Sequence, residues 1–259
     1  MRNDRPTFLG RRVFLGGASA LATLGPRLVG AADPEPKEIL VVGDSMIAGG
    51  FGLFLERELK KTHGFATRRR GKSSSGLARP DFFDWMEEAR NLVAERQPDA
   101  AVVMFGGNDV QGLYHTAAMR KEGAPKWLTW NDEKWPVEYA RRINEFCDIL
   151  APDGQQIFWV GLPTMRPDNF RKKVERVNTI YRAEMAIRSN ATYIDTWGVL
   201  ADDDGNYADH ICLEPAAEEG KSCKKVRVRA GDGIHISVAG AHHLKAFVLK
   251  TMLPALGVA

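Results

Sequence analysis

Short apolar runs alternate along the chain with segments in which apolar residues recur at every third or fourth position. Uninterrupted aliphatic runs are typical of strands buried on both faces, and the wider spacing is typical of helices packed against a core. The runs predict strands at residues 39–42, 67–70, 100–105, 157–162 and 192–194. The spacing predicts helices at residues 51–59, 80–96, 136–150, 174–185 and 238–252. Strands that alternate with helices predict an α/β fold, in which one domain holds a doubly wound parallel sheet between two helical layers.

The second predicted strand contains three consecutive arginines, Arg68, Arg69 and Arg70. Successive side chains of a strand point to opposite faces, so a central strand would bury at least one of these guanidinium groups. We therefore predict that this strand lies at an edge of the sheet, as it does in the strand order 2-1-3-4-5. Sites in such sheets form beyond the carboxyl ends of the strands, which makes the residues after each strand the candidates for function.

Ser45 follows the first predicted strand, within Gly43-Asp44-Ser45-Met46, and precedes a predicted helix. This turn places its hydroxyl at the carboxyl end of the strand, close to helix N–H groups that can stabilise an anion. A serine in this position is either the N-cap of the helix or a nucleophile.

Residues that could assist a serine nucleophile occur near three further strand ends or turns. Gly76 follows the second strand, Asn108 follows the third, and Asp232 and His235 precede the last helix. A spacing of three brings Asp232 and His235 to one side of a helical turn, where the carboxylate can orient the imidazole. A glycine N–H and an asparagine amide are suitable donors to an oxyanion. Together these residue types favour acyl transfer with Ser45 as the nucleophile.

The same residues give the chain a resemblance to a known family. Four blocks occur in the order found in the SGNH (GDSL-type) hydrolases: Gly43-Asp44-Ser45, Gly76, Gly107-Asn108-Asp109 and Asp232-Gly233-Ile234-His235. The resemblance spans about residues 38–253 and is greatest to an uncharacterised exported bacterial branch. It implies a flavodoxin-like fold and ester hydrolysis without a metal ion or another cofactor. It also implies these roles: Ser45 as nucleophile, His235 as base, Asp232 as its orienting group, and the Ser45 N–H, Gly76 and Asn108 as oxyanion donors.

The amino terminus reads as an export signal. Arg11 and Arg12 precede a small and apolar run from Gly16 to Leu24, and a small-residue site follows at residues 29–32. This order resembles a twin-arginine signal, and the apolar run is too short for a membrane span. We therefore expect a signal at residues 1–31, a linker at 32–37 and the hydrolase domain at 38–259. The expected location is the bacterial periplasm, reached through the twin-arginine export machinery.

The export signal also accounts for the basic charge of the chain. The full sequence has a formal net charge of +3, but residues 1–31 carry five of the 36 basic and one of the 33 acidic residues. The remainder therefore has a net charge of −1, which gives no reason to expect a nucleic-acid partner. The histidines show no metal-ligand spacing, so we expect no metal site.

Two segments bear on the substrate and on loop stability. The long connection at residues 106–131 contains Trp127 and Trp130, whose rings either bind a sugar or pack against the domain. The segment at residues 198–231 contains Cys212 and Cys223, which can pair in an oxidising compartment and would leave Cys147 free.

We therefore expect an exported serine esterase, with acetyl esters of a cell-envelope carbohydrate as its substrate. Two alternatives stay open. O-acyl transfer uses the same acyl-enzyme with a sugar hydroxyl in place of water, and would connect the protein to an envelope acyltransferase system. A non-catalytic glycan-binding module would keep the fold without needing Ser45, Asp232, His235 and Asn108 together.

Overall fold

The computed structural model describes residues 35–121, 123–214 and 223–258. Residues 36–259 form one compact unit, and the predicted export signal lies outside the described residues. The elements in chain order are β1 (Glu38–Gly43), α1 (Ser45–Ala48), α2 (Gly50–Lys61), β2 (Ala66–Gly71), α3 (Trp85–Glu95), β3 (Ala100–Met104), β4 (Leu113–Tyr114), α4 (Ala117–Lys121), β5 (Trp127–Leu128), α5 (Trp135–Leu150), β6 (Gln156–Val160), α6 (Asp168–Ala186), β7 (Ala191–Ile194), β8 (His210–Cys212), β9 (Lys225–Arg227) and α7 (Val238–Ala255).

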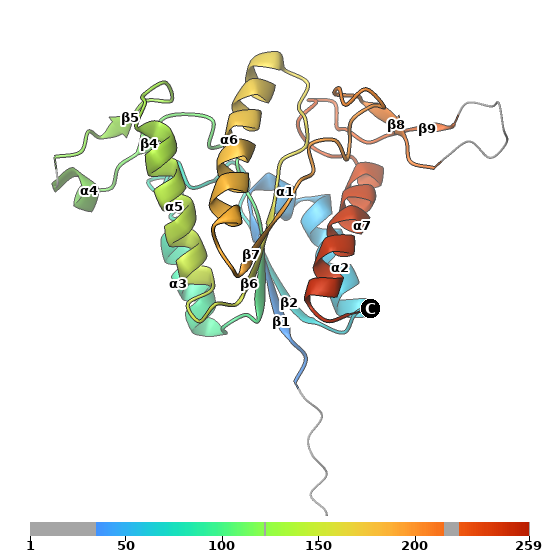
Figure 1. The fold of residues 1–259 in the computed structure, drawn as a ribbon, viewed down its shortest axis with the longest axis horizontal. Coiled ribbons are helices and arrows are strands. Elements are labelled where there is room, and N and C mark those ends of the chain that lie inside the picture. Colours follow the sequence, from blue (N-terminus) through green and yellow to red (C-terminus); the bar gives the residue numbers. More distant parts are fainter. Residues whose placement is uncertain (1–34, 122, 215–222, 259) are drawn as a thin grey trace, which may run out of the picture. The chain divides into compact units, whose positions relative to one another are not determined.

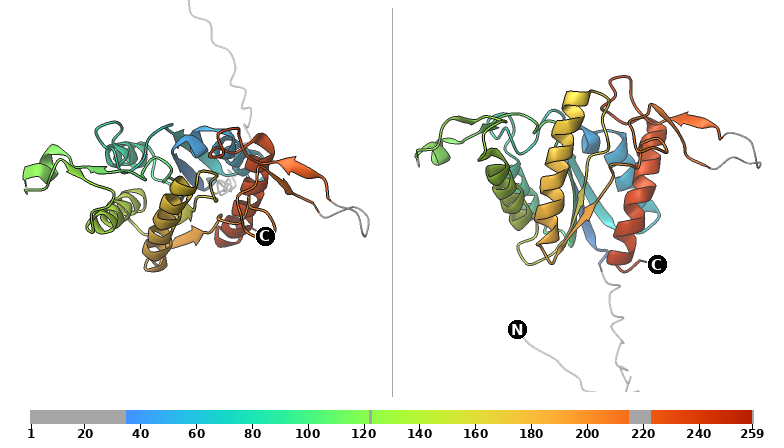
Figure 2. Two further views of the ribbon diagram at one scale, coloured as in Figure 1. Left: turned by 90° about the horizontal axis from the view of Figure 1, so that it is seen from above. Right: turned by 45° about the horizontal axis from the view of Figure 1, so that its top comes forward.

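The main sheet is parallel and has five strands in the order β2-β1-β3-β6-β7. Helices α2 and α7 contact each other on one face, and α3, α5 and α6 form the layer on the other (Figure 1). The view from above separates these two layers clearly (Figure 2). The five predicted strands, their order and the three-layer doubly wound fold are therefore confirmed.

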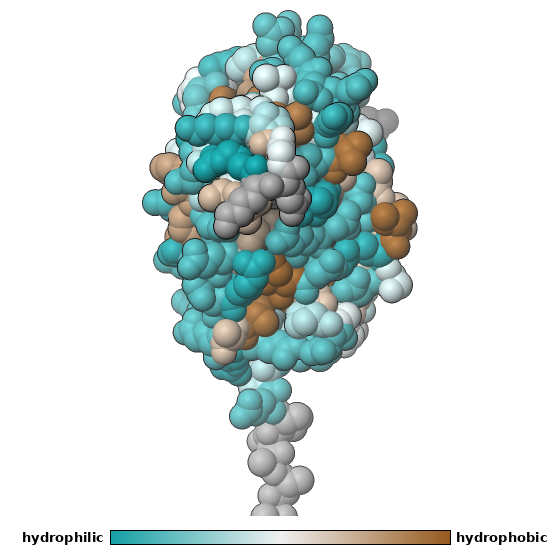
Figure 3. All heavy atoms as spheres, turned by 90° about the vertical axis from the view of Figure 1, so that its left-hand side faces the viewer, coloured by the Kyte–Doolittle hydropathy of each residue, from teal (hydrophilic) through white to brown (hydrophobic). Residues whose placement is uncertain are grey.

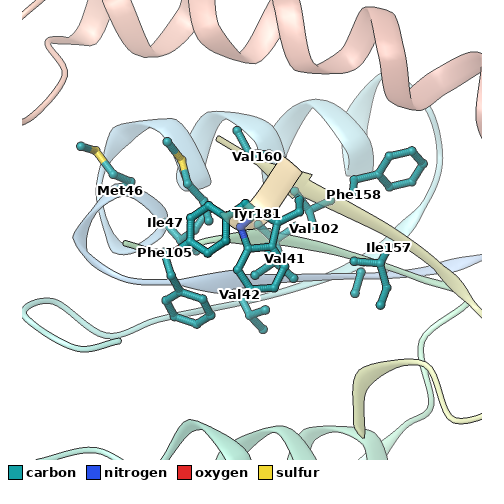
Figure 4. Close-up of a cluster of buried hydrophobic side chains, with 14 of the residues drawn as sticks. Val41, Val42, Met46, Ile47, Val102, Phe105, Ile157, Phe158, Val160 and Tyr181 are labelled. Atoms are coloured by element: carbon teal, nitrogen blue, oxygen red, sulfur yellow. The ribbon is translucent and has the colours of Figure 1, made fainter. Parts of the chain in front are cut away.

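The core lies where the two central strands meet the helices. Every residue of β1 and β3 is buried, because helices cover both faces of the sheet. Val41, Val102 and Phe158 belong to one cluster of buried side chains, against which Phe105 and Tyr181 also pack (Figure 4). This rigid core holds the carboxyl ends of the strands in fixed relative positions.

Strand β2 lies at the edge, as its arginines predict. Each arginine meets an acidic side chain from a neighbouring element: Arg68 pairs with Glu38, Arg69 with Glu56, and Arg70 with Glu88. Because the edge is open to solvent, the guanidinium groups reach these partners while they stay partly hydrated.

Several predicted elements differ in their bounds from those of the structure, and α6 begins at Asp168, six residues before the predicted start. The single helix expected after Ser45 is two helices, since α1 ends at Ala48 and α2 begins at Gly50, with Gly49 between them. The helix predicted at 80–96 begins only at Trp85, because the carboxylate of Asp84 caps it by accepting from the N–H groups of Met86 and Glu87. The connection at 106–131 contains the β4–β5 hairpin and the short helix α4.

Strands β8 and β9 form a second hairpin, which Cys212 and Cys223 join by a disulfide bond with their Cα atoms 5.8 Å apart. Cys147 is a buried free thiol on α5. No helix in the described parts of the chain has the length and apolar character needed to span a membrane.

We expect reduction of the Cys212–Cys223 disulfide to lower the Tm and to weaken esterase activity without unfolding the domain. A bridge that closes a loop of this size contributes roughly 2–3 kcal/mol in the chain-entropy description. The β8–β9 hairpin leads through Val228 into the Asp232–His235 turn, so loss of the disulfide should loosen that turn. Thermal melts and ester hydrolysis, measured with and without reductant, test this expectation. Equal Tm values in a Cys212→Ser/Cys223→Ser variant and the parent would contradict it.

Candidate active site

Ser45 is the first residue of α1. This short helix follows the carboxyl end of β1 (Figure 1). The N-cap of this helix is Asp44, whose Oδ1 accepts from the N–H of Met46 at 2.9 Å. Asp44 therefore takes the capping role, and the Ser45 hydroxyl is available for a different contact. That contact is with His235, whose Nε2 lies 2.9 Å from Ser45 Oγ.

His235 is in turn held by Asp232, whose Oδ2 lies 2.6 Å from His235 Nδ1. The other carboxylate oxygen accepts from the N–H groups of Ile234 and His235, both at 2.9 Å. Partial burial raises the pKa of Asp232, but these hydrogen bonds outweigh it and lower that pKa to about 2. Ser45, His235 and Asp232 thus form a continuous chain of hydrogen bonds in which a neutral imidazole can accept the serine proton.

A cavity of about 390 Å³ opens over Ser45 and His235. Met46, Leu162, Phe170 and Ile234 form its apolar walls, while its polar lining comes from Asp44, Ser73, Ser74 and Asn108. Phe170 and Ile234 are site residues that were not predicted from the sequence. Ile234 was detectable only through its place between Asp232 and His235, whereas Phe170 carries no motif signal.

Asn108 lines this cavity and projects from the loop after β3. Its Nδ2 donates to the backbone carbonyl of Ser75 at 3.0 Å and to Asp44 Oδ2 at 3.4 Å. The second of these bonds is long, so this amide hydrogen can turn toward a stronger acceptor at modest cost. Asn108 is therefore well placed to donate to an oxyanion on Ser45.

We expect Asn108→Ala to lower kcat on the order of 100-fold, which is typical for the loss of one oxyanion donor. The KM should change little, because an oxyanion forms only in the transition state. Steady-state kinetics with p-nitrophenyl acetate separate the two constants. A variant that raised KM and kept its kcat would instead make Asn108 a ground-state binding residue.

The structure does not group Gly76 with the other predicted oxyanion donors. Gly76 lines a neighbouring cavity with Leu77 and Trp85, and a Cβ on it would lie 2.1 Å from Asp109 Oδ1. The carbonyl of Ser75 accepts from Asn108 Nδ2. The Gly76 N–H lies on the opposite side of the same planar peptide and therefore points away from Asn108. This glycine is therefore needed for close packing on Asp109, and its geometry argues against the donor role.

Ser73 and Ser74 occupy the position near Ser45 that was expected of Gly76. Ser74 has a φ of 61°, and within the described residues it is the one non-glycine residue with positive φ. A non-glycine residue in this conformation costs about 1–3 kcal/mol and occurs most often near functional sites. Three consecutive serines gave no sequence signal for such a turn, because glycine or asparagine is the usual choice.

Trp127 is exposed, whereas Trp130 is half-buried and packs against the core. Trp127, on β5, is 39% exposed and packs against Tyr114 and the Arg79 guanidinium. Trp130 packs on Trp135, with ring centroids 4.3 Å apart. The face of the domain that carries the β4–β5 hairpin is mainly hydrophilic, with apolar residues in small groups (Figure 3). Trp130 therefore follows the packing alternative, and neither tryptophan belongs to the lining of the cavity over Ser45.

Two carboxylates near the site are buried: Asp44, in the lining of the cavity, and Asp109, on the loop after β3. Asp109 accepts hydrogen bonds from the Leu77 and Ala78 N–H groups and from the Tyr139 hydroxyl, so it braces the loop after β2. Burial raises the pKa of Asp109. Burial also raises the pKa of Asp44 to about 7, although the hydrogen bond from the Met46 N–H lowers it in part. Among the described residues, no group of His, Cys, Asp and Glu side chains is arranged to hold a metal ion.

The raised pKa of Asp44 predicts a pH-dependent stability. The pKa rises from 3.8 to about 7 in the folded protein, so folding favours the protonated form. The stability that Asp44 contributes is therefore complete below pH 4 and is lost as the pH rises to about 7. We expect the Tm of Asp44→Asn, relative to the parent, to increase over this range by several degrees (~5 °C). The exposed-loop variant Asp203→Asn is the control, and a Tm difference that does not vary with pH would contradict the prediction.

Solved structures share this architecture. The acetylxylan esterase Axe2 from Geobacillus stearothermophilus gives a TM-score of 0.56 at 19% identity, over 83% of this chain and 93% of that chain. LAE5, an alpha/beta hydrolase enzyme from the metagenome of Lake Arreo, Spain, gives 0.56 at 19% identity, over 83% and 94%. TesA gives 0.51 at 20% identity, over 84% and 99%. At these identities the likeness establishes the fold.

The sheet order and the four blocks at its strand ends define an SGNH (GDSL-type) hydrolase fold, which confirms the resemblance seen in the sequence. Residues 38–251 match the family described as "Protein of unknown function (DUF459)", and the chain belongs to this family. No curated protein matches the chain.

Proposed function

We propose that this protein hydrolyses carboxylic esters through an acyl-enzyme on Ser45. The observation that carries this proposal is the hydrogen-bonded series Ser45–His235–Asp232, with distances of 2.9 and 2.6 Å, at the floor of a cavity lined by Asn108. A non-catalytic module would not need a serine, an imidazole and a carboxylate in this order.

The reaction has two steps. Ser45 Oγ attacks the ester carbonyl while His235 Nε2 takes its proton, and the oxyanion accepts from Asn108 and from the Ser45 N–H. His235 then gives the proton to the leaving alkoxide, and the acyl group stays on Ser45. Water attacks this acyl-enzyme with His235 again as base, which releases the carboxylic acid and restores the serine.

The proposed substrate is an acetyl ester of a carbohydrate. Support comes from Axe2, an acetylxylan esterase whose catalytic mutants replace a serine, an aspartate and a histidine, the last two three positions apart. Asp232 and His235 have the same spacing. The apolar walls formed by Leu162 and Phe170 suit an acyl group, and the Ser73–Ser74 side offers hydroxyls to the alcohol part.

Hydrolysis assays with the purified protein test this function. We expect turnover of p-nitrophenyl acetate, with kcat/KM falling from acetate to longer acyl chains, and release of acetate from acetylated glycans. Glycan binding without turnover would favour the binding module. Both hydrolysis and acyl transfer proceed through the acyl-enzyme, and they differ in whether water or a sugar accepts the acetyl group. Acetyl transfer to an added sugar in excess of acetate release would therefore favour the acyltransferase alternative.

We further propose export to the periplasm by the twin-arginine route, since residues 1–31 have the order of basic, apolar and small residues typical of such signals. The variant with Arg11→Lys and Arg12→Lys should stay in the cytoplasm as precursor, because the export receptor reads the arginine pair itself. Normal export of this variant would assign the segment to a different route.

A further inference from the structure

The turn that carries Asp232 and His235 lies at the surface. The side chains of both residues are 45% exposed, so burial does little to hold them. The Gly233 N–H donates to the Ala230 carbonyl and the Ala230 N–H donates to the His235 carbonyl, which closes the turn upon itself. The Ser237 N–H also donates to the Val228 carbonyl, and Ile234 and Ile236 pack against the core, so any further connection adds to these contacts.

Arg166 provides a further connection through two hydrogen bonds. Its backbone N–H donates to the Gly233 carbonyl at 3.1 Å, and its Nη2 donates to the Gly231 carbonyl at 2.6 Å. These two carbonyls flank Asp232 on either side. Arg166, in the loop between β6 and α6, therefore binds backbone carbonyls on both sides of Asp232 in the sequence.

Gly233 is shaped to receive this arginine. It has a φ of 70°, which favours glycine, and a Cβ on it would lie 2.5 Å from Arg166 Cβ and 2.6 Å from Arg166 Nε. Such distances are too short for real atoms, so any other residue would displace the arginine or the turn. The glycine within Asp232-Gly233-Ile234-His235 thus has a partner outside the motif.

Arg166 is itself firmly anchored. It lies between β6 and α6, and Asn178 of α6 holds the nearby Leu162 by bonds to both its N–H and its carbonyl. The Thr164 N–H donates to the Trp197 carbonyl, and the buried Arg229 donates to the Thr164 carbonyl. A displacement of the Asp232–His235 turn would therefore have to strain a segment tied to the sheet.

We propose that Arg166 is a positioning residue that fixes the Asp232–His235 turn, so that His235 Nε2 stays within hydrogen-bonding distance of Ser45 Oγ. The proposal rests on the proposed function for its kinetic consequences, but not for its structural ones. Arg166 acts on this turn through hydrogen bonds to two carbonyls, whereas its ion-pair contact, 3.9 Å long, is with Asp209 outside the turn. A lysine would keep the charge and lose the fixed geometry.

Kinetics and NMR of Arg166 variants test the proposal. We expect Arg166→Ala to lower kcat for p-nitrophenyl acetate roughly 10–100-fold, with KM within about twofold, because a small displacement of a catalytic group costs turnover. Arg166→Lys should recover less than half of the loss on a logarithmic scale. Arg182→Ala, at an arginine of similar exposure paired with Asp195, is the matched control and should keep the parent kcat.

The decisive measurement does not need a substrate. The low-field NMR signal of the His235 Nδ1 proton reports its bond to Asp232, and its exchange with water should accelerate at least about tenfold in Arg166→Ala if the turn loosens. Unchanged exchange in a folded Arg166→Ala protein, or an unchanged kcat, would overturn the proposal. If the parent protein hydrolyses no ester but the exchange accelerates, the proposed function fails and the positioning role of Arg166 stands.

Discussion

Ser45→Ala is expected to abolish ester hydrolysis, with kcat falling on the order of 10⁵-fold or more while the fold stays intact. The lost hydroxyl bonds His235 and is not the helix cap, since Asp44 caps α1. Its removal therefore leaves the packing around β1 in place, but no acyl-enzyme can form. Residual turnover would come only from the oxyanion donors and the bound geometry.

The measurement is hydrolysis of p-nitrophenyl acetate, with the Tm recorded for each variant. Ser189→Ala, at an exposed serine between α6 and β7, is the matched control and should keep full activity. Mass spectrometry after mixing with substrate should detect an acylated peptide containing Ser45 in the parent only. Near-parent turnover by a folded Ser45→Ala protein would exclude Ser45 as the nucleophile.

Asp232→Asn is expected to lower kcat roughly 10³–10⁴-fold at neutral pH without a comparable change in KM. Asp232 Oδ1 accepts from two backbone N–H groups, so the asparagine oxygen should occupy that position. Its NH₂ group would then face His235 Nδ1, where Asp232 now offers an acceptor at 2.6 Å. This forces the imidazole proton onto Nε2, and that nitrogen can no longer accept the proton of Ser45.

The matched control for this variant is Asp195→Asn, because the Asp195 side chain is 48% exposed and Asp232 is 45% exposed. The control should keep its kcat, whereas Asp232→Asn should lose it while the protein stays folded. A loss of less than about tenfold in Asp232→Asn would show that the carboxylate does not orient the base.

The sequence alone was sufficient to predict the fold and to select the residues of the proposed mechanism. Buried strands read as unbroken aliphatic runs, and the three arginines of β2 identified an edge strand, which agrees with the order 2-1-3-4-5 of such sheets. Ser45, Asn108, Asp232 and His235 could also be selected, because each follows a strand or precedes a helix at the one edge of a parallel sheet where its loops converge.

Tertiary structure decided what depends on the path of each loop. Gly76 was predicted to be an oxyanion donor. The orientation of the Ser75–Gly76 peptide turns the Gly76 N–H away from Asn108, and the Gly76 Cα packs against Asp109. Trp130 looked available to a sugar, yet it packs on Trp135. The contact of Arg166 with Gly233 joins positions far apart in the sequence, and no local pattern predicts it. Hydrophobic periodicity records which face of an element is buried, whereas the direction of a loop amide depends on its φ and ψ angles and on what packs around it.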